Sequence, residues 1–179
     1  MARATRKRYY TKKSTTKWSP NIQEITTTTV QASASSTFFQ SFILAFNPTQ
    51  VNTAVSQVFT VKNVEVSFYI DSNIVASGVD IEDVAAYIMF VPQGMNITVD
   101  YNKQHPEYIM AYKFLGSPSP ENTTNTGQQY QPQRIKTRLM RKLQSGDNII
   151  LFIKGNNISQ TDQRSFDFHG LVRWWTKAN

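Results

Sequence analysis

The feature that most constrains the fold is a succession of eight apolar segments of strand length, separated by loops rich in Gly, Pro, Asn and Ser. The clearest segment is 58–71, where Val64, Val66, Phe68 and Ile70 alternate with more polar residues. Side chains of a β-strand point to opposite faces in turn, so this period of two predicts a strand with one buried face. The chain shows no internal repeat and no long amphipathic helix, and an all-β protein is therefore expected.

The other strand-like segments are 22–31, 37–46, 84–91, 111–115, 134–143, 148–154 and 164–176. Eight antiparallel strands in about 160 residues favour a two-sheet sandwich, with an eight-stranded jelly roll as the leading arrangement. An immunoglobulin-like sandwich fits less well, because it needs only about 100 residues and this chain lacks the Cys…Trp…Cys spacing. Segment 37–46 is apolar on both faces, which predicts burial on both sides, and 105–109 is expected to form one helical turn.

The net charge of the chain, +7, lies in its first eighteen residues. The chain holds 19 Lys plus Arg against 12 Asp plus Glu, and seven of these cations lie in this stretch, which contains no acid. We expect residues 1–20 to be a nucleic-acid-binding arm, disordered when free, and residues 21–179 to be the folded domain. The cations are Arg3, Arg6, Lys7, Arg8, Lys12, Lys13 and Lys17. Tyr9, Tyr10 and Trp18 can stack on unpaired bases. A solubility tail, or a nuclear import signal alone, is the alternative interpretation.

Segment 134–143 is predicted to carry a second basic surface. Its cations Arg134, Lys136, Arg138 and Lys142 are assigned to one face, and Ile135, Leu139 and Leu143 to the other. These cations are predicted to bind nucleic acid beneath the arms, and the alternative is an ordinary solvated strand face.

Two further features are candidate contacts with other subunits. The acidic residues Asp80, Glu82 and Asp83 form either a solvated loop or a salt-bridge or cation site at an interface. Alternation along 164–176 places Trp174 in the core, so Trp175 faces away from it. A large exposed aromatic side chain often marks a contact site, and Trp175 is therefore predicted to lie at a subunit interface.

The sequence contains little that indicates catalysis. The two histidines, His105 and His169, are far apart, and no nucleophile motif, phosphate-binding loop or metal-ligand spacing is present. The chain has no Cys, so thiolate metal sites and disulfides are excluded. No enzymatic activity, cofactor or metal is expected, and the longest apolar run, 84–91, is too short to span a bilayer.

Three stretches resemble the capsid proteins of circovirus-like small circular single-stranded DNA viruses. The first is the basic amino terminus that passes through Lys17 and Trp18 into a Thr-rich strand. The second is 105–110 (His-Pro-Glu-Tyr-Ile-Met), followed by 112–114 (Tyr-Lys-Phe). The third is 141–149 (Arg-Lys-Leu-Gln-Ser-Gly-Asp-Asn-Ile), a basic strand, a Gly-Asp turn and an apolar strand. The aromatic strand that ends in Trp174 and Trp175 also fits, so the resemblance covers the whole chain.

This resemblance implies a self-assembling icosahedral shell of about 60 identical subunits, with the arms facing inward onto a single-stranded DNA genome. It implies the virion and the host nucleus as locations, and nuclear import receptors and an unknown host attachment factor as further partners, without membrane insertion. The alternatives are a cellular single-stranded nucleic-acid-binding β protein and the capsid of a satellite RNA virus. About 60 arms would offset roughly 420 phosphates, fewer than the roughly 540 nucleotides that encode this chain, so other basic surface or small cations must contribute.

Overall fold

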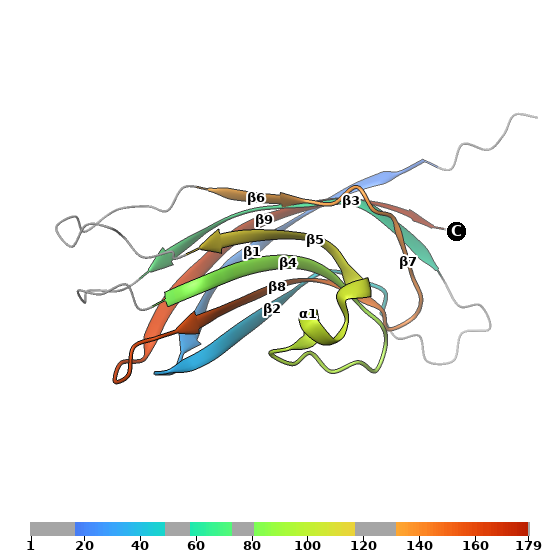
Figure 1. Cartoon of the computed structure of the whole chain (residues 1–179). Helices are drawn as coiled ribbons and strands as arrows, with labels where there is room; N and C mark the ends of the chain where they lie inside the picture. Colours follow the sequence, from blue (N-terminus) through green and yellow to red (C-terminus); the bar gives the residue numbers. More distant parts are fainter. Residues whose placement is uncertain (1–16, 49–57, 73–80, 117–131, 179) are drawn as a thin grey trace, which may run out of the picture.

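Two antiparallel sheets lie face to face in the computed structural model, which describes residues 17–48, 58–72, 81–116 and 132–178 (Figure 1). Sheet A contains β1 (Ser19–Ala32), β9 (Arg164–Ala178), β3 (Phe59–Ser72) and β6 (Gln133–Lys136) in that order, with β7 (Arg141–Leu143) also paired to β3. Sheet B contains β2 (Ser36–Phe46), β8 (Asn148–Asn157), β4 (Ile81–Val91) and β5 (Ile109–Gly116).

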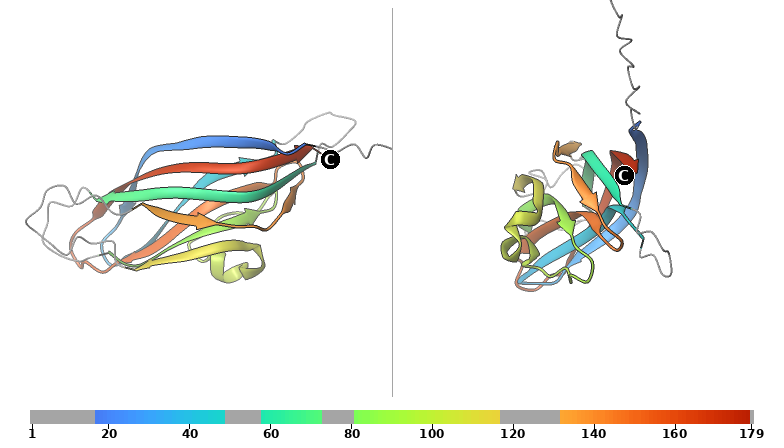
Figure 2. Two further views of the ribbon diagram at one scale, coloured as in Figure 1. Left: turned by 90° about the horizontal axis from the view of Figure 1, so that it is seen from above. Right: turned by 90° about the vertical axis from the view of Figure 1, so that its right-hand side faces the viewer.

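The strand order is that of a jelly roll. The chain crosses from sheet A to sheet B after β1, returns for β3, and crosses again between later strands, so that β9 is inserted between β1 and β3 and β8 between β2 and β4 (Figure 2). If β6 and β7 are counted as one interrupted strand, because both pair with β3, each sheet has four strands, as expected for two interleaved Greek keys. The predicted all-β jelly-roll class is confirmed.

The core lies between the sheets and follows the predicted alternation. Val64, Val66, Phe68 and Ile70 of β3 are all buried. The ring of Phe168 stacks on Phe42, with ring centroids 4.7 Å apart, and on Phe68 at 5.1 Å, so one aromatic row joins β2, β3 and β9. Because sheet B contributes Phe42 and sheet A contributes the other two rings, this row holds the two sheets together.

Two sequence expectations are corrected. Segment 37–46 is not buried on both faces along its length: Phe38, Phe42 and Leu44 face the core, while Ile43 is 55% exposed, and Ala45 becomes buried only after an irregularity in the pairing with β8 between Ile43 and Ala45. Segment 134–143 is not one strand: Thr137 still donates its backbone N–H to the Val64 carbonyl of β3 (2.9 Å), but residues 138–140 lie between the ladders that β6 and β7 form with β3. There the hydroxyl of Thr137 accepts a hydrogen bond from the Leu139 N–H (3.0 Å), a local contact that competes with strand pairing. Leu139 is consequently 51% exposed instead of buried.

Part of the outer face of sheet B is covered by the connection from β4 to β5. It contains α1 (Tyr101–Gln104) and the 3₁₀ turn η1 (Pro106–Tyr108), which confirms the predicted helical turn with Pro106 at its start. Tyr101 is fully buried here, its hydroxyl lies 3.3 Å from the Phe90 carbonyl oxygen, and burial raises its pKa to about 12. The connection thus has a small apolar core of its own with Met89, Ile150 and Phe152.

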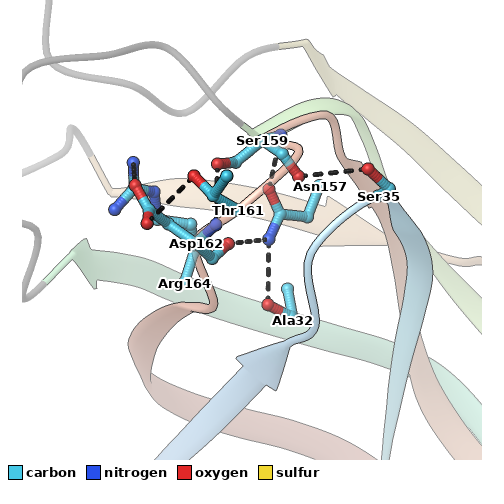
Figure 3. Close-up of polar contacts among 7 residues, drawn as sticks. All are labelled: Ala32, Ser35, Asn157, Ser159, Thr161, Asp162 and Arg164. Carbon is cyan, nitrogen blue, oxygen red and sulfur yellow. Dashed lines mark hydrogen bonds and ion pairs between the residues drawn. The ribbon is translucent and has the colours of Figure 1, made fainter.

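Asn157 joins the loops at one end of the jelly roll (Figure 3). Its buried side-chain amide donates to the carbonyl oxygens of Ala32 (2.9 Å) and Asp162 (3.0 Å), and its side-chain oxygen accepts from the Ser159 N–H (3.0 Å). The β8–β9 loop is also tied to the β1–β2 turn, because the Ser159 carbonyl accepts hydrogen bonds from the Ser35 N–H (2.8 Å) and from the Ser35 hydroxyl (3.3 Å), the second of which is drawn in Figure 3. This end is therefore held by specific polar contacts.

Asp147 organises the opposite end of the jelly roll. Its carboxylate accepts hydrogen bonds from the backbone N–H groups of Gln93 (3.0 Å) and Gln144 (2.8 Å). Gly146 has a φ of +86°, and a Cβ there would lie 2.6 Å from Gln93, so the turn before β8 requires glycine. Within the described residues, none of the helices is long and apolar enough to cross a membrane.

Candidate nucleic-acid interface

The structure describes only the end of the predicted arm. Arg3, Arg6, Lys7, Arg8, Tyr9, Tyr10, Lys12 and Lys13 lie outside the described residues. Lys17 is exposed and Trp18 is half-buried, immediately before β1 begins at Ser19. The division into an arm at 1–20 and a domain at 21–179 stays a prediction, although the strand includes Ser19 and Pro20.

Trp18 contacts the outer face of sheet A. The ammonium nitrogen of Lys62, a residue of β3, lies 3.9 Å from the centroid of the Trp18 ring. Lys62 is paired across the sheet with Trp175 of β9, and Trp175 is paired in turn with Pro20 of β1. The guanidinium carbon of Arg173 lies 5.7 Å from the Trp175 ring centroid. Each of the two rings thus has a cation within the usual cation–π distance.

A buried carboxylate lies beside these rings. Glu65 of β3, with a side chain only 8% exposed, forms ion pairs with Arg134 (2.6 Å), Arg173 (3.1 Å) and Lys136 (3.5 Å). The hydrogen bond from Arg134, together with the charges of Arg134, Arg173 and Lys136, holds the pKa of Glu65 below its ordinary value even though burial opposes this. One acid therefore fixes three cations in place and leaves the group with an excess of positive charge.

The four cations predicted at 134–142 are not equivalent. Arg134 and Lys136 are partners of Glu65, so part of their charge is neutralised within the protein. Lys142 is exposed on β7, where it is paired with Thr60 of β3. Arg138 is exposed in the segment between β6 and β7. The predicted basic surface is present, but the interruption of the strand divides it.

The predicted acidic contact site is described only in part. Asp80 lies outside the described residues. Glu82 and Asp83 are exposed near the start of β4, and the Asp83 carboxylate accepts a hydrogen bond from the Asn156 side chain (3.3 Å). Asp83 borders a concavity of about 560 Å³ on the outer face of sheet B, where Lys154 pairs with Asp100 at 3.0 Å. A role for these acids in subunit contacts stays a prediction.

The two tryptophans of β9 lie on opposite faces, as alternation predicts. Trp174 is partly buried and packs against the main core, while Trp175 lies on the outer face with Lys62 and Arg173. Trp175 is half-buried rather than fully exposed. Its predicted place in a subunit interface is not tested by the isolated chain.

The histidines do not form a catalytic arrangement with each other. His105 stacks against Tyr108 in the β4–β5 connection, and His169 stacks on Tyr69 on the outer face of sheet A. In the ranges that the structure describes, no group of three or more acidic, His or Cys side chains could hold a metal ion.

Comparison with known proteins does not assign the chain to a family. No protein-family model and no curated protein sequence matches the chain. Three similar solved structures are of infectious bursal disease virus: the VP2 subviral particle (10% identity, TM-score 0.36), the Gx strain (10%, 0.33) and the Gt strain (13%, 0.35). The matches cover 87%, 88% and 87% of this chain but only 32%, 32% and 33% of those chains. The chain therefore spans about a third of their length. Its fold assignment rests on its own strand order.

Sequence reasoning missed three residues of this surface: Lys62, Glu65 and Arg173. Lys62 and Glu65 lie among the polar positions of β3, and Arg173 lies between apolar positions of β9, so each resembles an ordinary solvated residue. Their association depends on the pairing of β3 with β9, which places Glu65 opposite Arg173 and Lys62 opposite Trp175. A local pattern cannot predict which distant strands become neighbours.

Proposed function

We propose that this protein is the subunit of an icosahedral viral capsid that self-assembles and packages single-stranded DNA, with its basic arm directed onto the genome. The observation that carries this proposal is the distribution of large apolar side chains over the surface. Each of the following is 47–71% exposed: Ile22, Ile43, Phe46, Tyr112, Phe114, Leu139, Met140, Ile158 and Leu171. They come from both sheets, from the segment between β6 and β7, and from the β8–β9 loop.

Such a distribution suits a subunit that has neighbours on several sides. Contiguous exposed apolar patches mark interaction surfaces, and some of these side chains are close together in sequence, such as Tyr112 with Phe114 on β5 and Leu139 with Met140. A closed shell covers such surfaces on every subunit by repeating the same contacts. The jelly roll and the basic arm support the same proposal. The acids Glu82 and Asp83 are proposed as polar partners within these contacts, together with Asp80. The proposed locations are the virion and the host nucleus, with nuclear import receptors and a host attachment factor as partners.

A cellular protein that binds single-stranded nucleic acid is the second candidate, because Trp18 and Trp175 with their cations would serve it equally well. It would be a monomer or small oligomer. Its exposed apolar side chains would then have no neighbouring subunit to cover them.

Electron microscopy of the purified full-length chain distinguishes the two proposals. Expressed without nuclease treatment and viewed in negative stain, the capsid subunit should give closed particles of uniform diameter. Nucleic acid extracted from these particles should be protected from added nuclease until the shell is disrupted. Small species whose bound nucleic acid is digested at once would instead support the cellular binding protein. Digestion of the protected material by DNase or by RNase identifies the cargo.

A further inference from the structure

We propose that the outer face of sheet A beside the arm is itself a binding track for single-stranded nucleic acid, with Trp175 as its stacking platform. This inference rests on the proposed function and names the folded part of its nucleic-acid site. The track consists of three cross-strand rows on that face. The first row, nearest the carboxyl end of β9, contains Lys177, Thr60 and Lys142. The second contains Pro20, Trp175 and Lys62, and the third contains Ile22, Arg173, Glu65 and Lys136.

Charge is the first argument for this track. The three rows hold five cations and one acid, and that acid, Glu65, is buried beneath the guanidinium and ammonium groups that it pairs with. The acid therefore presents little negative charge to solvent, and it orders Arg173 and Lys136 for an external anion. A surface of this kind attracts phosphates without any sequence preference.

The alternation of residue types along β9 is the second argument. Arg173, Trp175 and Lys177 lie on the same outer face, and successive side chains on one face of a strand are about 7 Å apart. An aromatic ring between two cations can stack on one base while the cations contact the flanking phosphates. This combination characterises proteins that bind single strands, because every base has a face that can stack.

Continuity with the arm is the third argument. Lys17 is exposed immediately before β1, and Trp18 lies under Lys62 of the second row. A nucleic-acid strand bound by the arm would therefore reach sheet A at Trp18 and Lys62. The arm cations alone are too few to offset the phosphates of the gene that encodes this chain. The cations of these rows, in excess over Glu65, add positive charge where the arm joins the body.

The test uses the full-length chain and a short oligodeoxythymidine, with binding followed by quenching of tryptophan fluorescence. In Trp175→Leu the affinity should fall about tenfold, because one stacking contact is lost, and the quenching should fall to the part that Trp18 contributes. In the double variant Lys62→Gln/Lys142→Gln the slope of log K against log salt should become shallower by about 1.4, because two cations no longer contact phosphate. Glu65 forms its ion pairs with Arg134, Lys136 and Arg173 and not with these two lysines, so the fold should be retained, and a thermal melt checks this.

Lys103→Gln is the matched control. Lys103 is an exposed cation of α1 on the opposite side of the molecule, and its loss should leave both the affinity and the salt slope unchanged. If the track variants bind with wild-type affinity, slope and quenching while wild-type particles still form, the track is refuted and the capsid proposal stands. If the wild type neither binds the oligonucleotide nor forms particles, the proposed function itself fails. If Trp175→Leu binds normally but no longer assembles, Trp175 is a subunit contact and the inference is overturned.

Discussion

Glu65 positions three of the cations on the outer face of sheet A. It forms ion pairs with Arg134 of β6, about 70 positions later in the sequence, and with Arg173 of β9, 108 positions later. No pattern in the sequence distinguishes it from the polar positions beside it, since only the register of β3 with β6 and β9 brings these cations to it. The alternation of β3 could be predicted from sequence, but the partners of its one buried acid could not.

Glu65→Gln should destabilise the fold by about 1–2 kcal/mol at pH 7, because the amide cannot replace charged hydrogen bonds to three cations. The folded-state pKa of Glu65 lies below its ordinary value of 4.5, so its contribution is complete above that value and is lost as the pH falls through the lowered pKa. Urea unfolding at a series of pH values should show the wild-type advantage shrinking below pH 4.5. The control Glu24→Gln, an exposed acid of β1, should change stability by less than about 0.5 kcal/mol. If the difference in free energy of unfolding between the wild type and Glu65→Gln did not depend on pH, the ionised Glu65 would not be the source of the stabilisation.

Asn157→Ala should cost about 2–3 kcal/mol, because it leaves the buried carbonyl of Ala32 and two other backbone groups without their partner. Thermal or urea unfolding measures this cost, and Gln160→Ala in the same loop, where the side chain is exposed, is the control and should be nearly neutral. Equal effects of the two substitutions would mean that the loop is not held by Asn157.

At the scale of elements, the sequence predicts strands well where alternation is strong and poorly where side chains compete with the backbone ladder. β3 and β8 lie close to the ranges predicted from their apolar positions. The segment at 134–143 divides at Thr137, whose hydroxyl contact is local, and β2 has an exposed outer face that its apolar residues do not predict. An apolar residue in a strand is consistent with burial in the core and with a contact outside the chain, and periodicity cannot tell these apart.

Deletion of residues 1–16 should leave the jelly roll folded. Every described strand begins at Ser19 or later, and Trp18 with its Lys62 contact is retained. Circular dichroism should show an unchanged β spectrum, and the melting temperature should shift by no more than a few degrees, while nucleic-acid affinity falls sharply. Loss of the cooperative melt would contradict the division into arm and domain.

At the scale of the whole molecule, binding should be independent of sequence and steeply dependent on salt. Seven arm cations that engage one single strand give a slope of log K against log salt near −5, and contributions from sheet A make it steeper. Titrations of oligonucleotides of several sequences over a range of salt concentrations measure both properties. A flat response to salt, or a strong preference for one sequence, would rule out binding dominated by phosphate contacts.

The central claim is that this chain builds a shell, and the mass of the purified full-length protein tests it most directly. Light scattering coupled to size-exclusion chromatography should give a single species of about 60 subunits, or roughly 1.2 MDa for a chain of 20.5 kDa, with additional mass from enclosed nucleic acid. A monomer or small oligomer under every salt and protein concentration tested would contradict the claim. The protein would then be a cellular binding protein that uses the same basic and aromatic surface.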